Sequence, residues 1–501
     1  MNILVILFLC TIVIGSSTSI DCTTIPNPEI GRYQPAVCPV DLPEGSDLTD
    51  KLEFGYIAVP EQHTKPDGPV IQVAVARFRS ASDQPAADPI VLINGGPGDS
   101  NLDLFVRLMA GPMGKAFLSQ RDVVIIEIRG LRYSKPNLVC DEVFEAQLRM
   151  VDKDLKGEEA NQVLLTAMRA SHDRFVKAGI NLSAYNNVET AADIALVMTI
   201  LKYDQFNMLA ASAGTIVAQH VMRNHPERVR SVILNAAVPI GFPFFRDLIL
   251  NACRSLQRVF ELCEADSACR LAYPDLENRF FSYVEKLNTE PVTIPVKNPN
   301  TGEEVSFVLN GDRLSTWLFV SMYFNTQVPH SLHKLMAGDY TEFQRHVRIF
   351  FPMRSFSYGL SYTVFSTEYL DFDVEDTRID GRYARFADGI SLFFGPKLIV
   401  QAKEFWHVSP IDRSFLEPLK SDIPTLILNG ELDHVLPRKY VEEMASNLEK
   451  GYIYVFPGVA HSPIDAGLCP FSMILEFLTD PSKAPDAECI KQFKHVFLTN
   501  Q

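Results

Sequence analysis

The stretch that decides the fold reads Phe206-Asn-Met-Leu-Ala-Ala-Ser212-Ala-Gly-Thr-Ile-Val-Ala-Gln219. An apolar run leads to Ser212 and a helix-forming run follows it, which predicts a strand, a tight turn that carries the serine, and a helix. A turn this sharp needs very small residues two positions before and after the serine, and Ala210 and Gly214 occupy these positions. The pattern is typical of a nucleophile elbow, in which the positive N-terminal end of the helix points at a developing oxyanion. An ordinary strand-to-helix junction that contains a serine would look similar, so the rest of the chain decides between the two.

The composition is that of a folded globular protein, because 47% of the 501 residues are hydrophobic and 21% are charged. The formal net charge of −15 argues against nucleic acid or an anionic membrane as a partner, since both attract basic surfaces. It mildly favours cationic substrates, including peptides with a free amino terminus. Residues 1–19 combine an apolar run with small residues at its end and are predicted to be a signal peptide. We therefore expect an exported protein, secreted or periplasmic, without a membrane-spanning segment in its mature part.

The cysteines support an oxidising compartment, because the predicted mature chain keeps an even set of them. Proximity along the chain favours the pairs Cys22–Cys38, Cys263–Cys269 and Cys469–Cys489, which leaves Cys140 with Cys253. Connectivity cannot be deduced from sequence alone, and the alternative is that several of these cysteines stay free and buried. The chain has no CxxC or HxxxH spacing, so we expect no metal site.

Strands and helices alternate along much of the chain. Continuous apolar runs predict buried strands over residues 89–94, 122–128, 206–211, 229–234, 424–429 and 452–456. Helical patterns between and after these runs include 187–203, 438–449 and 470–478. This alternation predicts an α/β fold with a mostly parallel sheet flanked by helices, preceded by a hairpin over 52–60 and 70–78.

The pattern changes between residues 242 and 407. Helical segments over 246–263 and 274–287 are followed by segments rich in aromatic residues. We interpret this region as an inserted, mainly helical cap, because the strand–helix alternation resumes after it. The predicted organisation is a signal peptide over 1–19, a first part of the core over 20–241, the cap over 242–407 and a second part of the core over 408–501.

Two late strands end near residues that serine chemistry requires. Asp433 follows the run 424–429, and His461 follows the run 452–456. A serine hydroxyl becomes a nucleophile when a histidine takes its proton, and the histidine needs a buried carboxylate to hold its tautomer. Each of the two is by itself more simply a loop residue. Together with the elbow, they predict a catalytic triad of Ser212, His461 and Asp433.

An oxyanion hole needs two backbone N–H groups near the nucleophile. Ala213, directly after the serine, supplies the first. The segment Asn94-Gly-Gly-Pro-Gly98 follows a buried strand, and its glycines let the backbone approach a substrate closely. We therefore predict that Gly95 or Gly96 supplies the second donor, although glycine and proline also make simple tight turns.

Taken together, these motifs resemble the proline iminopeptidase and tripeptidyl-aminopeptidase branch of the α/β-hydrolases, which are serine exopeptidases. Asn94-Gly-Gly-Pro-Gly98 is similar to that branch's His-Gly-Gly-Pro-Gly signature, and Glu127-Ile-Arg-Gly130 with Ser134-Lys-Pro136 is similar to its Asp-Gln-Arg-Gly…Ser-x-Pro block. The elbow followed by Arg223-Asn-His-Pro-Glu-Arg-Val229 resembles its Gly-x-Ser-Tyr-Gly-Thr…Tyr-Pro-Glu-Arg-Val stretch. Gly430-Glu-Leu-Asp433 and Pro457-Gly-Val-Ala-His461 match the secreted tripeptidyl-aminopeptidase-like subgroup. The departures from the pattern lie around the expected site, at Asn94, Glu127, Ile128, Ala210 and Ala213.

The resemblance implies an α/β-hydrolase fold with a helical cap, no metal and no cofactor, and a peptide substrate whose free amino terminus is held by a cap carboxylate. Glu368, an acidic residue among aromatic ones, is the candidate for this anchor. The alternative is a solvated carboxylate in an acidic stretch that also contains Asp371, Asp373, Glu375 and Asp376.

We therefore expect a secreted serine aminopeptidase that releases proline or a short peptide from free amino termini. The number of residues released and the oligomeric state stay open. Two alternatives remain. One is a carboxylic ester hydrolase with the same triad, and the other is a catalytically silent binding protein on this fold.

Overall fold

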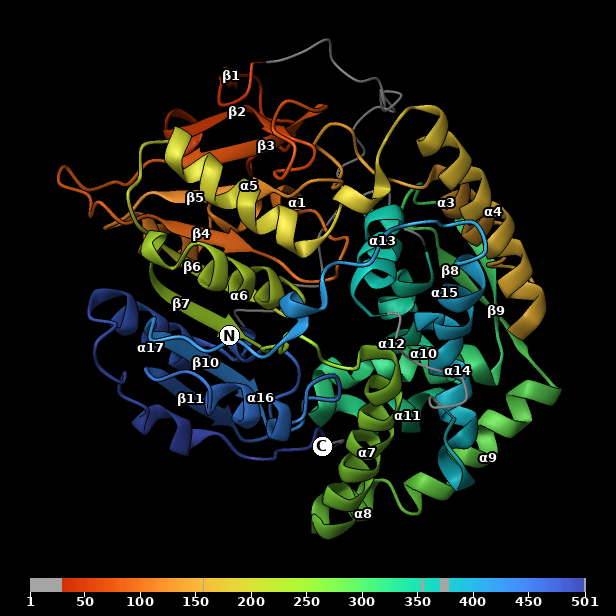
Figure 1. The fold of residues 1–501 in the computed structure, drawn as a ribbon. Helices are drawn as coiled ribbons and strands as arrows, with labels where there is room; N and C mark the ends of the chain where they lie inside the picture. The colour runs from red at the N-terminus through yellow and green to blue at the C-terminus, as the bar shows by residue number, and fades with distance from the viewer. Residues whose placement is uncertain (1–28, 156, 352, 354–355, 370–377, 500–501) are drawn as a thin grey trace.

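The computed structural model describes residues 29–499 apart from 156, 352, 354–355 and 370–377. The described residues form a nine-stranded sheet in the order β1-β2-β3-β5-β4-β6-β7-β10-β11, with helices on both faces and a cap at its side (Figure 1). The strands of this sheet are β1 (Tyr33–Pro35), β2 (Leu52–Pro60), β3 (Val70–Phe78), β4 (Ile90–Ile93), β5 (Val123–Glu127), β6 (Phe206–Ala211), β7 (Val229–Asn235), β10 (Thr425–Gly430) and β11 (Gly451–Phe456).

The sheet is antiparallel from β1 to β5 and parallel from β5 through β4, β6, β7 and β10 to β11. The predicted mostly parallel sheet is confirmed, and each predicted strand coincides with an observed one to within about two residues. The strands could be predicted from continuous apolar runs because helices cover both faces of the parallel part of the sheet, so that side chains on both faces of a strand are buried.

Two helical layers cover the sheet. Helices α5 (Asn187–Ile200), α6 (Gly214–Asn224) and α16 (Arg438–Ala445) pack on one face. Helices α1 (Asn101–Leu108), α2 (Pro112–Leu118) and α17 (Leu468–Thr479) pack on the other. Side chains alternate between the two cores, as Val91 and Leu92 of β4 illustrate. Because β4, β6, β10 and β11 are parallel, the glycine-rich segment, Ser212, Asp433 and His461 follow the same edge of the sheet, the carboxyl edge of these strands.

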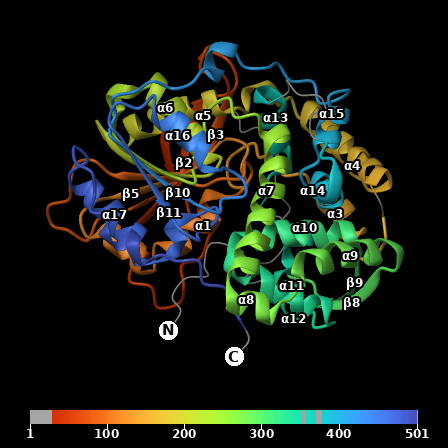
Figure 2. The same ribbon diagram turned by 90° about the horizontal axis from the view of Figure 1, so that it is seen from below.

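A cap connects β7 to β10 and lies beside the sheet in both ribbon views (Figures 1 and 2). Its helices are α7 (Phe244–Ala265), α8 (Ser267–Ala272), α9 (Leu276–Thr289), α10 (Gly311–Ser321), α11 (Val328–Met336), α12 (Thr341–His346), α13 (Tyr358–Glu368), α14 (Ala384–Phe394) and α15 (Pro396–Ala402). It also contains an antiparallel hairpin of β8 (Val292–Lys297) and β9 (Glu304–Leu309). Buried aromatic side chains such as Phe280, Phe307 and Trp317 give the cap an apolar core of its own.

Helices α3 (Asp141–Leu148) and α4 (Gly157–Lys177) enlarge this cap side (Figure 1). They precede the elbow in the chain, yet their apolar residues share one cluster with residues of α13 and α15, including Met168, Leu360 and Leu398. Helices α3 and α4, which the sequence placed with the core, therefore pack against the cap helices.

Two of the predicted disulfides are present, Cys263–Cys269 and Cys469–Cys489. The predicted pair Cys140–Cys253 is wrong, because both residues are free buried thiols. They lie in different apolar clusters. The prediction paired them only because the other cysteines had been assigned, and proximity along the chain does not show which cluster a cysteine joins. Burial raises the pKa of each of these two thiols to about 12. Cys38 is also free, and Cys22 lies outside the described residues.

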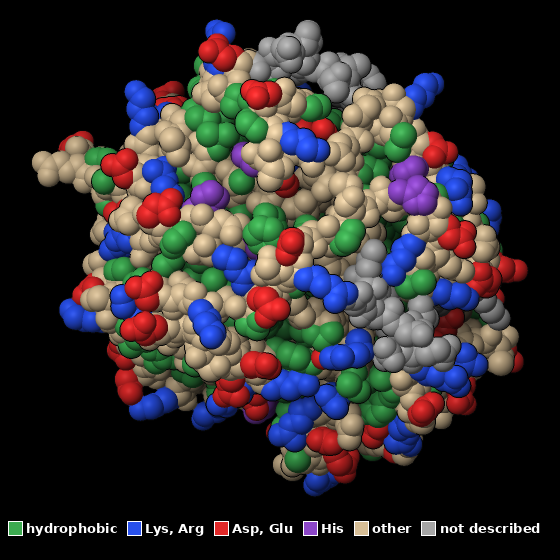
Figure 3. All heavy atoms as spheres, in the orientation of Figure 1, with side chains coloured by type: hydrophobic (Ala, Val, Ile, Leu, Met, Phe, Trp, Pro, Cys, Tyr) green, Lys and Arg blue, Asp and Glu red, His purple; other side chains and the backbone are tan. Residues whose placement is uncertain are grey.

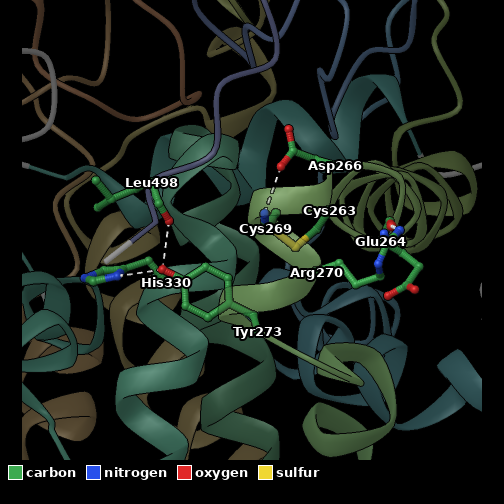
Figure 4. Close-up of a disulfide and its surroundings, with 8 residues drawn as sticks. All are labelled: Cys263, Glu264, Asp266, Cys269, Arg270, Tyr273, His330 and Leu498. Atoms are coloured by element: carbon green, nitrogen blue, oxygen red, sulfur yellow. Dashed lines mark hydrogen bonds between the residues drawn. A yellow bond between two sulfur atoms is a disulfide. The ribbon is translucent and has the colours of Figure 1, made fainter. Parts of the chain in front are cut away.

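The C-terminal segment ties the core to the cap. On the core side, the His495 Nε2 atom lies 3.0 Å from a carboxylate oxygen of Glu431. On the cap side, the Leu498 N–H donates to the Thr326 carbonyl at 3.1 Å. The Tyr273 hydroxyl donates to the Leu498 carbonyl at 2.8 Å, just after the turn that Cys263–Cys269 closes (Figure 4).

The visible surface is charged and mixed. Asp and Glu side chains are interspersed with Lys and Arg over the face in Figure 3. Among the described residues, no helix has both the length and the apolar character needed to cross a bilayer.

The fully buried side chain of Arg129, directly beyond β5, links the sheet to helix α5. Its guanidinium donates to both carboxylate oxygens of Asp193, at 2.8 and 2.6 Å. Its remaining N–H groups donate to the backbone carbonyls of Pro60, Glu61 and Ala184. All five donors of the guanidinium are therefore satisfied inside the protein, which is the condition under which a buried charge is tolerated.

We predict that Asp193→Ala lowers the free energy of unfolding by about 3–5 kcal/mol, because it removes both hydrogen bonds to a carboxylate from the buried Arg129 and leaves only Glu189, at 3.7 Å, as an acidic neighbour. Urea unfolding followed by circular dichroism measures this. Glu488→Ala, which breaks the exposed pair with Lys491, is the matched control and should cost less than about 1 kcal/mol. Equal losses for the two variants would contradict the prediction.

Candidate active site

Strand β6, the Ser212 turn and helix α6 form the predicted strand–turn–helix unit. Ser212 has a φ of +50°, a left-handed conformation that costs energy for a residue with a side chain. Its N–H donates to the Asn235 carbonyl at 3.0 Å, which holds the turn against β7. A Cβ atom on Gly214 would overlap the Asn94 carbonyl, so only glycine fits there. Ala210 is fully buried in β6, and its methyl group is accommodated without loss of the turn.

The structure brings the three predicted triad residues together. The His461 Nε2 atom lies 2.9 Å from Ser212 Oγ, and His461 Nδ1 lies 2.8 Å and 3.0 Å from the two carboxylate oxygens of Asp433. Asp433 is almost fully buried, and its Oδ1 accepts hydrogen bonds from the N–H groups of Val435 and Leu436. These bonds fix the carboxylate toward the imidazole. The serine, the histidine and the acid thus form one hydrogen-bonded line.

The segment Asn94–Gly98 lies directly against the serine. A Cβ atom on Gly95 would come within 2.7 Å of Ser212 Cβ and 3.2 Å of Ser212 Oγ. Within the described part of the chain, neither the Gly95 N–H nor the Ala213 N–H donates to a protein acceptor. Gly95 and Ala213 therefore offer two backbone donors beside the nucleophile, the arrangement that an oxyanion requires.

Two buried asparagines that sequence reasoning missed hold the loops of this site. Asn101 accepts from the Asn94 N–H at 2.8 Å and donates to the Ile126 carbonyl at 2.7 Å, which joins the loop after β4 to β5. Asn235 donates to Ser462 Oγ and accepts from the Ile464 N–H, which holds the loop after His461. In the sequence, each of these asparagines is only a polar residue near the end of an apolar run. Many ordinary turns have such a residue, so the sequence did not distinguish these two.

Glu127, one of the departures from the resembled pattern, is fully buried at the end of β5. Its carboxylate accepts from the Leu102 N–H at 3.0 Å, in the first turn of α1, and from the Tyr133 N–H at 3.4 Å. Burial raises its pKa to about 8 in spite of the Leu102 bond. The group is therefore largely protonated at neutral pH and supports the helix that follows the glycine-rich segment.

Glu368, the predicted substrate anchor, is the last residue of α13 and is buried. One carboxylate oxygen accepts from the Asn187 N–H at 2.9 Å, and the other accepts from the Asn187 side-chain amide at 2.7 Å. The carboxylate thus stabilises the N-terminus of α5, and burial raises its pKa to about 7. The alternative carboxylates Asp371, Asp373, Glu375 and Asp376 lie outside the described residues.

The cap contacts the loop that carries Asp433. The carbonyl of Leu432 accepts from the Asn325 amide at 2.9 Å and from the Ser255 hydroxyl at 3.2 Å, and both donors belong to the cap. The ring of Tyr323, in the short helix η4 (Met322–Gln327), packs edge-on 5.6 Å from the His461 ring. The cap therefore covers the triad and helps to position its acid.

A family model described as alpha/beta hydrolase fold matches residues 88–467. Serine protease Hip1 of Mycobacterium bovis is 27% identical over 224 residues, which is 44% of this chain and 42% of that protein. Tripeptidyl aminopeptidase of Streptomyces coelicolor is 24% identical over 196 residues, 38% of this chain and 36% of that protein. The matched regions thus span less than half the length of these curated relatives.

Among solved structures, proline iminopeptidase of Mycobacterium smegmatis aligns over 85% of this chain and 98% of its own, with 12% identity and a TM-score of 0.34. A similarity at this level carries no argument about activity.

We predict that Gly95→Ala slows covalent labelling of Ser212 by a fluorophosphonate about 100-fold or more. The new methyl group would displace the backbone that donates beside the serine, and loss of one such donor costs about this much. Gly111→Ala is the control, since its Cβ would approach a single atom, the Leu108 carbonyl oxygen, remote from the site. Labelling at the wild-type rate in Gly95→Ala would contradict the prediction.

We also predict that Glu127→Gln flattens the pH dependence of stability. With a folded-state pKa of about 8 against an ordinary 4.5, the folded protein keeps a proton that the unfolded chain releases in this window. The free energy of unfolding of the wild type therefore falls as pH rises from about 5 to 8, by up to about 1.4 kcal/mol per pH unit from this group. Urea unfolding at several pH values measures the difference between the slopes. Equal slopes for the two proteins would show that Glu127 is not held protonated.

Proposed function

The chain belongs to the α/β-hydrolase fold family, and we propose that it is an exported serine exopeptidase that releases proline or a short peptide from free amino termini. The observation that carries this proposal is the hydrogen-bonded line from Ser212 through His461 to Asp433 beneath the cap. A hydroxyl, an imidazole and a buried carboxylate in this geometry are the parts that acyl transfer requires.

In the proposed mechanism, Ser212 Oγ attacks the scissile carbonyl carbon while His461 Nε2 takes its proton. Asp433 accepts from the protonated Nδ1, which keeps Nε2 available as the base and stabilises the imidazolium that forms. The N–H groups of Ala213 and of Gly95 or Gly96 stabilise the oxyanion. His461 then protonates the leaving amine. Water, activated by the same histidine, hydrolyses the acyl-enzyme and restores the free serine.

Several features favour peptides as substrates. Two curated relatives bear the names of a serine protease and a tripeptidyl aminopeptidase. The motif resemblance points to the same class, and the net charge of −15 suits a substrate with an ammonium group. The two disulfides support export, and the predicted signal peptide lies outside the described residues.

The test uses matched fluorogenic peptide amides with free or acetylated amino termini. We expect cleavage of the free peptides, and we expect Ser212→Ala to lower kcat about 10⁴-fold or more, because removal of the nucleophile leaves only binding and oxyanion stabilisation. Ser472→Ala, in helix α17 on the surface, is the matched control and should retain wild-type activity.

Cleavage of free and acetylated peptides at equal rates would contradict an exopeptidase and favour an endopeptidase. Turnover of simple esters without any turnover of peptides would favour an ester hydrolase. Activity that survives Ser212→Ala would contradict the assigned nucleophile.

A further inference from the structure

The Asp99 carboxylate lies on the segment that carries the proposed oxyanion donors, three residues beyond Gly96. We propose that Asp99 binds the ammonium group of the substrate's first residue, so that the enzyme releases one amino acid at a time. This inference rests on the exopeptidase function proposed above and names its substrate contact.

Two distances show where Asp99 lies. Its Oδ2 atom lies 3.5 Å from the point that a Cβ atom on Gly96 would occupy. On the other side, the carbonyl of the preceding residue, Gly98, accepts from the Ser357 N–H at 2.8 Å, where the cap enters α13. Asp99 therefore lies between the glycine-rich segment and the cap.

The cap residue Tyr323 lies near both Asp99 and the triad. The Tyr323 ring packs 5.6 Å from the His461 ring. Its phenol pKa is raised first by burial and then by the negative charges of Asp433 and Asp99. Both carboxylates therefore lie near the same cap side chain. Asp99 therefore lies near the cap side chain that packs against His461.

The Asp99 carboxylate has no partner among the described residues. Its neighbours differ in this respect, because Asp103 accepts from the Tyr133 hydroxyl at 2.8 Å and Glu127 accepts from two backbone N–H groups. Asp99 is only partly exposed, and burial together with the charge of Asp103 raises its pKa to about 6. An enclosed carboxylate without a partner is costly, and a cation brought by a ligand would remove that cost.

The position of Asp99 beside the oxyanion donors also means that binding of the substrate amine affects the reaction rate. An unpaired negative charge beside the oxyanion donors opposes the negative charge that develops in the transition state. A substrate ammonium paired with Asp99 cancels this opposition. An acetylated amino terminus carries no charge and cannot do so. Free amino termini are therefore favoured in the transition state as well as in binding.

The spacing sets the number of residues released. In a substrate that loses one residue, the ammonium nitrogen lies about 2.5 Å from the scissile carbonyl carbon, and each further residue moves it by up to about 3.6 Å. An anchor beside Gly96 therefore suits single-residue release. Glu368 lies eleven residues beyond Ser357, about 16 Å along α13, and its oxygens already accept from Asn187.

The experiment compares Asp99→Asn with two other isosteric variants, Glu368→Gln and Asp103→Asn, on single-residue coumarin amides with free or acetylated amino groups. We expect Asp99→Asn to lower kcat/KM for the free amides about 10- to 100-fold, the range of a hydrogen bond to a charged group. The variant should cleave the acetylated amides at least as fast as the wild type does, because it no longer carries the opposing charge. Asp103→Asn should retain the preference for free amines. Labelling of Ser212 by an uncharged fluorophosphonate should not slow in Asp99→Asn, which separates amine binding from damage to the triad.

A second measurement keeps this inference separate from the proposed function. Prolinamide and alaninamide, each free or acetylated, are tested for protection of Ser212 from the fluorophosphonate. Protection by the free forms in the wild type but not in Asp99→Asn supports the anchor even if no peptide is cleaved, in which case only the peptidase function falls. A preference for free amines that survives in Asp99→Asn, or that is lost only in Glu368→Gln, overturns the anchor and leaves the exopeptidase standing. No discrimination by the wild type in either assay overturns both.

Discussion

The left-handed turn at Ser212 is the constraint on which the rest of the site depends. It lifts Ser212, the proposed nucleophile, out of the sheet, and the backbone around it must leave room. Gly95 and Gly214 provide this room, because a Cβ atom at either position would collide with the serine or with the Asn94 carbonyl. The parallel order of β4, β6 and β7 brings these segments to one edge of the sheet, and the Ser212 N–H bond to Asn235 holds them together. The fold thus stores local strain at the point where reactivity is needed.

The cap contacts two members of the proposed triad or the backbone beside them. Hydrogen bonds from Asn325 and Ser255 reach the backbone beside Asp433, and Tyr323 packs against His461. The C-terminal segment joins Glu431, two residues before the acid, to Thr326 in the same cap helix as Tyr323. A displacement of the cap would therefore change the surroundings of Asp433 and His461.

Sequence reasoning succeeded where a local pattern has one physical cause. Buried parallel strands gave continuous apolar runs, and the ends of those runs pointed to Ser212, Asp433 and His461, which the structure joins in one hydrogen-bonded line through His461. It failed where the answer depends on tertiary contacts. The pair Cys140–Cys253 was assigned by elimination, although the two thiols lie in separate cores. Whether Glu368 is engaged and Asp99 unpaired depends on Asn187 and on the cap, which no local pattern specifies.

The most direct test of the central claim is the site and rate of covalent modification by a fluorophosphonate, located by mass spectrometry of the digested protein. We predict a single adduct on Ser212, formed about 10⁴-fold more slowly in Asp433→Asn, because an amide in place of the carboxylate would not hold His461 in the productive tautomer. An adduct on another residue, or an Asp433→Asn variant that reacts at the wild-type rate, would contradict the triad as the reactive unit.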